Sequence, residues 1–317
     1  MRKRKNRPAV KNNTTLVSLV GLAFFSIVLI FFPGQNRYLS LRLSDIPREP
    51  EIILPSPAPY PVNITGSQPE ELTAQGVVIT DFASGETLFA RNENKHMAPA
   101  STTKMMTALV AIENYDLDTV LAVKTVITEG SAMGLVVGEK ITVEHLLYGA
   151  LIHSGNDAAY TLAENFPGGI EAFVHAMNQK AEQLHLTNTH FTNPIGFDDS
   201  NHYTTPKELL RLARAVVGHK ELTKIVAIPE ITVSDVSYTH FHKLQNVNEL
   251  VGKIPGVSGL KTGFTENAGE SVVSMVERDG HKILIVVLNS EDRFKETKEL
   301  INWVFGNFEW KKISPDF

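Results

Sequence analysis

Three short motifs of this 317-residue chain combine residue types that can transfer an acyl group. They occur in the order Ser101-Thr102-Thr103-Lys104, Ser154-Gly155-Asn156 and Lys261-Thr262-Gly263. A serine is a weak nucleophile unless a base lies beside it, and the first motif supplies a lysine three residues later. The second motif offers a polar proton relay and the third a cationic anchor for a carboxylate. Together, in this order, they predict a serine enzyme that forms an acyl intermediate.

The first motif needs a helix to bring Ser101 and Lys104 together. Apolar residues at spacings of three and four predict a helix that begins at Ser101: Met105, Ala108, Leu109 and Ile112. Residues three apart on a helix share one face, and the helix start adds free N–H groups where an oxyanion could form. Lys104 can serve as a base only if its pKa falls, through burial or through a nearby cation such as Lys261.

A second Ser-x-x-Lys, Ser258-Gly259-Leu260-Lys261, overlaps the third motif. Roughly one such pattern is expected by chance in a chain of this length, because both residue types are common. Its surroundings indicate a loop that enters a strand, where residues three apart point to opposite faces. We therefore assign Lys261 to substrate binding and take Ser101 as the nucleophile.

Each of the other two motifs, taken alone, is a weaker indication of an active site. Ser154-Gly155-Asn156 lies between two helical patterns, and by itself is more typical of a helix end followed by a new N-cap at Asn156 or Asp157. Lys261 and Thr262 would face a substrate carboxylate, and Gly263 would let a ligand approach the backbone closely.

No metal or other cofactor is expected. His240 and His242 could share one face of a strand, but no third ligand stands at a recognisable spacing.

The elements that must position these motifs follow from local patterns. Two hairpins are expected, one joining residues 76–81 to 86–90 and one joining 271–276 to 283–288. Helices are expected over residues 143–152, after Asn156, and over 170–184, 205–217 and 295–305, and a capping box with Pro206 opens the fourth of these. Strands at both ends with helices between them predict a mixed α/β (α+β) domain, and the absence of a regular βαβ alternation disfavours a doubly wound parallel sheet.

The N-terminal segment carries a targeting pattern. Residues 1–15 contain six basic residues and no acidic one, and residues 16–32 contain no charge. We expect a cytoplasmic head over 1–15 and a transmembrane signal anchor over 16–32, with the rest of the chain outside. A cleaved signal peptide is the rival interpretation, but Phe31 and Phe32 stand where a cleavage site needs small residues.

Composition divides the rest of the chain. Half of its 16 prolines fall within residues 33–70, which predicts a semi-rigid stalk, and residues 71–317 are long enough for one catalytic domain. Residues 12–317 contain 24 of the 30 Lys and Arg residues and all 35 Asp and Glu residues, which gives a net charge of −11. A nucleic-acid partner is therefore not expected, because phosphate binding needs a basic surface. There is no cysteine, and therefore no disulfide framework.

With these motifs placed, the chain resembles the serine-type D-alanyl-D-alanine carboxypeptidases, which are low-molecular-mass penicillin-binding proteins. The resemblance runs from about Thr73 to Trp303. Its longest matching stretches are Pro99 to Leu109, His153 to Ala159, Asn193 to Phe197 with Asn201-His202-Tyr203, and Gly256 to Thr265. It implies a serine β-lactamase/transpeptidase-like fold, in which helices flank an antiparallel sheet.

The resemblance also implies a role for each site residue. Ser101 would attack the peptide bond between two D-alanines of a peptidoglycan stem pentapeptide, and Lys104 would be its base. Ser154 would relay the proton, and Asn156 would bind substrate or orient Lys104. Lys261, Thr262 and, more weakly, Arg293 would hold the terminal carboxylate. The backbone N–H groups of Ser101 and Phe264 would form the oxyanion hole, and β-lactam antibiotics would be covalent inhibitors.

Three other functions stay open at this stage. A D,D-endopeptidase acting on cross-links would use the same chemistry with a differently shaped pocket. A β-lactamase is disfavoured because the chain has no E-x-x-L-N stretch and carries S-G-N where S-D-N is common. A membrane-tethered penicillin sensor would need an output module, for which residues 1–15 are short. The expected location is the bacterial cytoplasmic membrane, single-pass, with the catalytic domain on the extracytoplasmic side.

Overall fold

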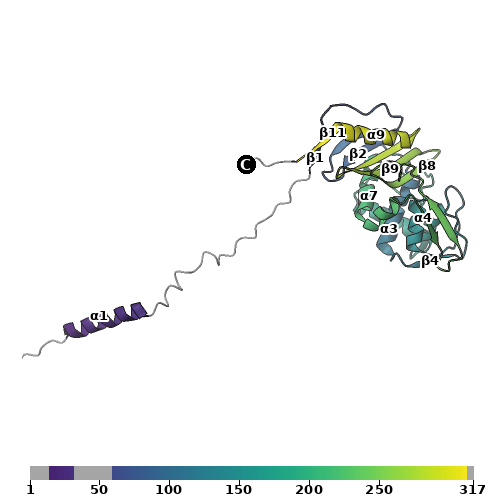
Figure 1. Cartoon of the computed structure of the whole chain (residues 1–317). Helices are drawn as coiled ribbons and strands as arrows, with labels where there is room; N and C mark the ends of the chain where they lie inside the picture. The colour runs from purple at the N-terminus through teal and green to yellow at the C-terminus, as the bar shows by residue number, and fades with distance from the viewer. Residues whose placement is uncertain (1–13, 32–58, 313–317) are drawn as a thin grey trace, which may run out of the picture. The chain divides into compact units, whose positions relative to one another are not determined.

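The computed structural model of the chain describes residues 14–31 and 59–312 (Figure 1). The chain divides into two compact units, residues 1–56 and 57–317, and each is described by itself. The described part of the first unit is one helix, α1 (Thr14–Phe31). The second unit contains every other element and all three motifs.

A five-stranded sheet forms the centre of the second unit. Its order is β3 (Thr87–Arg91), β2 (Gly76–Asp81), β10 (His281–Ser290), β9 (Gly269–Arg278) and β8 (Val257–Thr265). Each neighbouring pair is antiparallel. Both hairpins expected from the sequence, β2–β3 and β9–β10, are confirmed. The third motif lies on β8, at the edge of the sheet.

Helices cover both faces of this sheet (Figure 1). Ile283, Ile285 and Val287 of β10 pack with α9 (Arg293–Asn307), whereas the alternate residues face the larger group of helices. Successive side chains of a strand point to opposite faces, so a strand buried on both sides is apolar throughout. The mixed α/β architecture with an antiparallel sheet, expected from the sequence, is confirmed.

The larger helical layer surrounds α3 (Lys104–Asn114), whose first eight residues are all buried. Its other helices are α4 (Val143–Leu151), α5 (Asn156–Glu164), α6 (Gly169–Gln183), α7 (Pro206–Gly218) and α8 (Lys220–Val226). A helix that is apolar all round must be enclosed by others. The first motif therefore opens a helix that is enclosed by the rest of this layer.

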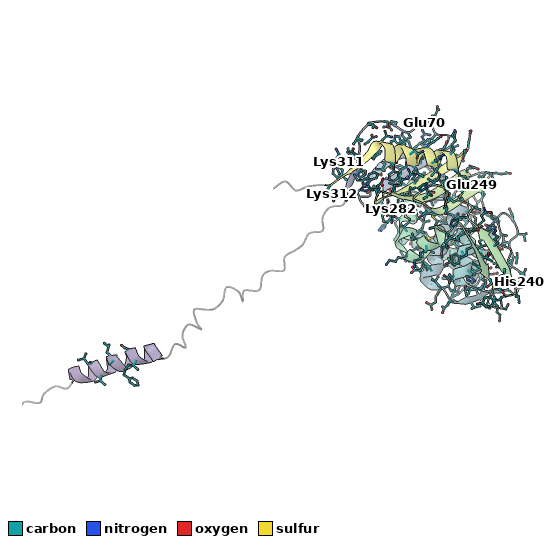
Figure 2. All side chains as sticks on the ribbon, viewed as in Figure 1. Glu70, His240, Glu249, Lys282, Lys311 and Lys312 are labelled. Carbon is teal, nitrogen blue, oxygen red and sulfur yellow. The ribbon has the colours of Figure 1, made fainter. Side chains whose placement is uncertain are left out.

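Two small two-stranded sheets complete this layer: β4 (Val120–Ala122) with β5 (Lys140–Thr142), and the hairpin of β6 (Glu230–Ser234) and β7 (Phe241–Gln245). Buried His242 of β7 lies 2.7 Å from a carboxylate oxygen of Glu139 and 3.1 Å from the carbonyl oxygen of Met133. These bonds hold the hairpin of β6 and β7 against the segment before β5. His240 lies in the turn of that hairpin, at the surface (Figure 2).

Two helix starts differ from expectation. The α-helix begins at Lys104, and Ser101 lies in the preceding 3₁₀ turn, η2 (Ala100–Thr103). At α7, the Thr205 side chain accepts from the N–H of Glu208, as expected, but the Glu208 carboxylate accepts from Asn188 and Thr189. The reciprocal half of the capping box is therefore absent, because a nearby loop offers Glu208 its own buried donors.

A two-stranded ribbon of β1 (Tyr60–Asn63) and β11 (Phe308–Lys311) joins the two ends of the second unit. The indole N–H of Trp310 donates to Asp81 at the end of β2, over 2.8 Å. Pro61 is tolerated here because a two-stranded ribbon leaves one side of each strand unpaired. The stalk expected over residues 33–70 thus overlaps the folded unit at residues 60–63.

The helix expected over residues 16–32 overlaps α1. Across residues 14–31 and 59–312, no helix has both the length and the apolar character needed to cross a membrane. The transmembrane anchor is not confirmed and stays a prediction from the sequence.

The enclosure of α3 predicts the cost of truncating it. Leu109 is fully buried, so Leu109→Ala should lower the free energy of unfolding by about 2–5 kcal/mol. Urea titration of the wild type and the variant measures this loss. Val137→Ala, at a valine with 70% of its surface exposed, is the control and should change stability by less than about 0.5 kcal/mol. Equal small losses from both variants would contradict the enclosure of α3.

Candidate active site

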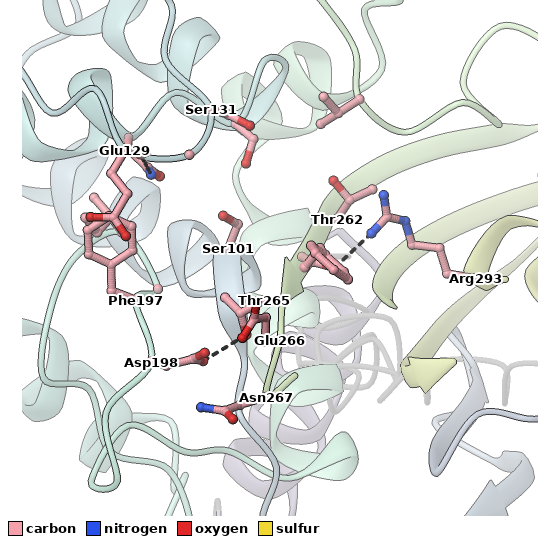
Figure 3. Close-up of a pocket in the computed structure, with 18 residues that line it drawn as sticks. Ser101, Glu129, Ser131, Phe197, Asp198, Thr262, Thr265, Glu266, Asn267 and Arg293 are labelled. Atoms are coloured by element: carbon pink, nitrogen blue, oxygen red, sulfur yellow. Dashed lines mark hydrogen bonds between the residues drawn. The ribbon is translucent and has the colours of Figure 1, made fainter. Parts of the chain in front are cut away.

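A cavity of about 780 Å³ lies where the edge strand β8 meets the helical layer (Figure 3). Seven of the nine site residues expected from the sequence line it: Ser101, Ser154, Asn156, Thr262, Gly263, Phe264 and Arg293. The other two, Lys104 and Lys261, are buried and do not line the cavity. Figure 3 shows Ser101 between Glu129 and Phe197 on one side and Thr262 and Arg293 on the other.

The amine of Lys104 forms three short hydrogen bonds. Its Nζ lies 2.8 Å from Ser101 Oγ, 2.7 Å from Asn156 Oδ1 and 2.8 Å from the carbonyl oxygen of Ile195. Asn156 and Ile195 offer only acceptors to it, so they use two N–H groups of the amine. The remaining position points at the Ser101 hydroxyl, where a neutral amine presents its lone pair.

Burial makes that neutral form accessible. Lys104 has no exposed surface, and its burial lowers its pKa to about 7, while the Asp157 carboxylate opposes the fall. The neutral and charged forms therefore balance near neutral pH, where a general base is most effective. Of the two causes expected from the sequence, burial is therefore the larger one.

Asn156 is placed to orient the lysine. Its side-chain oxygen accepts from Lys104, and its side-chain N–H donates to the carbonyl oxygen of Glu129 over 2.7 Å. Its backbone N–H donates to the carbonyl oxygen of Ser131, also over 2.7 Å. Because both the oxygen and the nitrogen of its side-chain amide form hydrogen bonds, these partners fix the orientation of the amide. Of the two roles open from the sequence, this geometry supports orienting Lys104.

Asp157 is a residue that the motif search missed. Its fully buried carboxylate accepts from the backbone N–H groups of Met133, Gly134 and Leu135 at 2.9 to 3.0 Å. It thereby fixes the loop that carries Glu129 and Ser131 along the cavity, and its charge acts on Lys104. The available signal was an acidic residue directly after the second motif.

Ser154 lies in the loop between α4 and α5, as the sequence predicts. It is 94% buried, since its exposed fraction is 6%, yet it lines the cavity. Its φ is +62°, a left-handed conformation that a serine adopts only when its surroundings impose it. The N–H of Gly155 donates to the carbonyl oxygen of Gly149 over 2.9 Å and holds the loop against α4.

Two glycines let other segments approach the turn that carries Ser101. A side chain at Gly196 would place its Cβ 1.9 Å from the carbonyl oxygen of Ala100, and Gly196 has a φ of +91°. A side chain at Gly263 would place its Cβ 3.1 Å from the Ala100 side chain and from the carbonyl oxygen of Pro99. Gly263 therefore brings β8 against the nucleophile's turn, as expected for a residue that permits close approach.

Lys261 lies behind Thr262. Its Nζ donates to the carbonyl oxygen of Thr262 over 2.8 Å. Burial, together with repulsion from Lys104 and Arg293, holds the pKa of Lys261 well below its usual range. What the third motif presents directly to the cavity is Thr262 and Gly263.

Arg293, the first residue of α9, completes this wall. Its Nη1 donates to the carbonyl oxygen of Gly263 over 2.9 Å (Figure 3). Among the described residues, its buried Nε atom has no hydrogen-bond partner. Phe264 stands at the rim with 62% of its surface exposed. Across the cavity, the Thr265 hydroxyl donates to Asp198 over 2.8 Å.

The second Ser-x-x-Lys is arranged differently from expectation. Ser258 pairs with Met275 and Lys261 with Val273, and the register shifts between Gly259 and Lys261. A β-bulge of this kind adds one residue, so Ser258 and Lys261 share one face of the sheet instead of lying on opposite faces. The expectation that Ser258 and Lys261 point to opposite faces is therefore wrong. Lys261 nonetheless bonds to Thr262 and not to Ser258.

Comparison with known proteins gives one family. The family model described as D-alanyl-D-alanine carboxypeptidase, peptidase S11, matches residues 63–292. The chain is 31% identical over 256 residues to D-alanyl-D-alanine carboxypeptidase DacF of Bacillus subtilis, a match that covers 77% of this chain and 66% of DacF. It is 34% identical over 261 residues to DacA of Haemophilus influenzae, which covers 77% of this chain and 65% of DacA. The chain thus spans slightly less than two thirds of the length of each of these two relatives.

Solved structures with the same fold include the following two. The DD-transpeptidase of Streptomyces K15 superposes with a TM-score of 0.71 at 29% identity, over 76% of this chain and 100% of that one. Penicillin-binding protein D2 of Listeria monocytogenes, in its ampicillin-bound form, superposes with a TM-score of 0.67 at 29% identity, over 75% of this chain and 100% of that one.

The burial of Lys104 predicts a titration that can be measured directly. In protein labelled with ¹³C at the lysine ε-carbons, the NMR signal lost in Lys104→Ala should titrate with a midpoint near pH 7, being charged below it and neutral above it. Asp157→Asn should move the midpoint to lower pH, because the charge that opposes the fall is removed. A midpoint above about 9, close to that of a free lysine, would show that the amine is not desolvated.

Proposed function

Since this chain belongs to the peptidase S11 family of D-alanyl-D-alanine carboxypeptidases, we propose that it is a serine peptidase that removes the terminal D-alanine from peptidoglycan stem pentapeptides. The observation that carries the proposal is the buried Lys104 amine, whose pKa is about 7 and which lies 2.8 Å from Ser101 Oγ in the wall of a cavity. A serine with such a base can attack a carbonyl carbon near neutral pH.

In the proposed reaction, the Ser101 oxygen attacks the carbonyl carbon of the penultimate D-alanine while Lys104 takes the hydroxyl proton. The carbon–nitrogen bond to the terminal D-alanine then breaks, and the proton reaches the leaving amine through Lys104 and Ser154. Water hydrolyses the serine ester and releases the shortened peptide. The N–H groups of Ser101 and Phe264 are the proposed donors to the oxyanion.

The terminal carboxylate is proposed to bind at Thr262 and Arg293, which both line the cavity. A carboxylate there would also stabilise the charged form of Lys261, whose amine lies behind Thr262. Because β8 is an edge strand of the described sheet, no further strand pairs with its outer side, where an extended peptide would add as a new strand. These features favour a peptide that ends in a carboxylate over other acyl compounds.

β-Lactam antibiotics are the proposed covalent inhibitors. They offer a strained carbonyl to the same serine, and the penicillin-binding protein of Listeria monocytogenes with this fold is known in an ampicillin-bound form. The acyl group would remain on Ser101 wherever water reaches the ester slowly.

The activity is tested by offering a stem pentapeptide that ends in D-Ala-D-Ala and measuring free D-alanine. The wild type should release it, and Ser101→Ala should release it at least roughly a thousand times more slowly, because no other group can form the ester. Ser258→Ala, in the second Ser-x-x-Lys, is the matched control and should retain the wild-type rate.

Labelling with a fluorescent penicillin separates the alternatives. Labelling of Ser101 without any release of D-alanine would reject the carboxypeptidase and favour a penicillin sensor. Rapid loss of the label together with hydrolysed penicillin would favour a β-lactamase.

We also propose that the chain is anchored in the bacterial cytoplasmic membrane through residues 16–32, with the catalytic domain on the extracytoplasmic side. This proposal rests on the sequence alone, which places six basic residues ahead of an uncharged apolar run.

Fractionation of expressing cells tests the anchor. The full chain should sediment with membranes, resist a wash at high salt and high pH, and dissolve in detergent. A chain that begins at Pro57 should stay in the supernatant. Release of the full chain by the wash would reject the anchor.

A further inference from the structure

A second hollow of about 680 Å³ adjoins the reaction cavity. The two share one lining residue, Val247, whose side chain is partly exposed. The hollow is otherwise polar in much of its lining, with His153, Gln245, Asn246 and Glu249 around it. Val247 thus borders both the reaction cavity and the second hollow, and each of these spaces is large enough for a small molecule.

Val247 is held firmly in this position. Its N–H donates to the carbonyl oxygen of Ile152 over 3.0 Å. On one side, the Asn246 side chain donates to the carbonyl oxygens of Val226 and Ile228. On the other side, Asn248 is buried, its amide donates to Ser274, and its side-chain oxygen accepts from Leu250. The partition is therefore a fixed part of the structure.

Two lining residues of the second hollow connect it with the groups that are proposed to handle the leaving group. Its residue His153 directly precedes Ser154, the proposed proton relay to the leaving amine. Its residue Glu249, at the surface in Figure 2, also acts on the proposed carboxylate anchor. Burial lowers the pKa of Arg293, and the nearby charges of Glu270, Glu249 and Asp292 oppose that fall. Ser154 and Arg293, the two groups that would handle the leaving residue, thus line the reaction cavity together with Val247.

We propose that Val247 is the specificity-determining wall of the leaving-group site, which restricts the leaving group to a residue as small as D-alanine. Removal of this wall would join the two hollows and admit the larger leaving group of a cross-linked peptide. This inference rests on the proposed function. In both reactions the ester forms at Ser101, the carbon–nitrogen bond breaks, and the leaving amine takes up the serine proton. Only the size of the amine differs.

The test compares two substrates in the full-length protein. One is a stem pentapeptide, which releases D-alanine, and the other is a D,D-cross-linked peptide dimer, which releases a whole stem peptide. Val247→Gly should raise the ratio of kcat/KM for the dimer to kcat/KM for the pentapeptide at least about tenfold. Val247→Ala should give a smaller rise, and Val247→Ile should leave the ratio unchanged.

Val137→Gly is the matched control, because it makes the same change at a valine with 70% of its surface exposed and outside both hollows. It should leave both rates unchanged. Penicillin labelling of Ser101 in each variant shows that the reaction cavity is intact, so a loosened segment around residue 247 is recognised by reduced labelling with both rates lowered together.

The outcomes separate this inference from the proposed function. Release of D-alanine by the wild type, with a ratio that stays within twofold in Val247→Gly and Val247→Ala, overturns the role of Val247 alone. Efficient cleavage of the dimer by the wild type also overturns it, since the wall would then exclude nothing. A wild type that turns over neither substrate overturns the proposed function and, with it, this inference.

Discussion

The burial of Lys104 beneath Ser101 is the constraint on which the rest of the site depends. An exposed lysine is protonated at neutral pH and accepts no proton, so the amine becomes a base only when water is removed from around it. Desolvation alone would leave its N–H groups unsatisfied, at a cost of several kcal/mol. Asn156 and the carbonyl oxygen of Ile195 remove that cost, and Asp157 keeps the charged form within reach. These partners come from distant parts of the chain, so the base exists only after the helical layer has assembled.

The same assembly shapes the space in which a substrate would lie. Gly196 and Gly263 allow a loop and the edge strand β8 to close on the turn of Ser101 from two directions. The cavity lies where β8 meets the helices, and Arg293 is a cationic residue in its lining, together with Thr262 and Gly263 of the third motif. In our proposal, Val247 then limits how far the cavity extends beyond the carboxylate-binding residues Thr262 and Arg293. The nucleophile Ser101 and the proposed size-selecting residue Val247 are therefore different lining residues of the same cavity.

Much of the fold could be predicted because its signals are local. The β9–β10 turn contains Asp279-Gly280, and α7 is opened by Thr205 and Pro206, so neighbouring residues specify both features. Apart from the start of α3, the failures involve partners distant in sequence. The ribbon of β1 and β11 joins segments almost 250 residues apart, and Glu208 turns from its own helix start to Asn188. The bulge in β8 reversed the face on which Ser258 lies, which no alternation pattern reveals.

By itself, the sequence determined which groups are available for chemistry: a serine with a lysine three residues on, a polar relay and a cationic anchor, in a recognisable order. Only the tertiary structure decided what these groups can do. It made burial the main cause of the lowered pKa of Lys104, placed Lys261 behind Thr262, and introduced Asp157 and Val247. The reason is physical. Residue type and spacing are properties of the chain, whereas desolvation, hydrogen-bond satisfaction and cavity size depend on every segment that packs around a group.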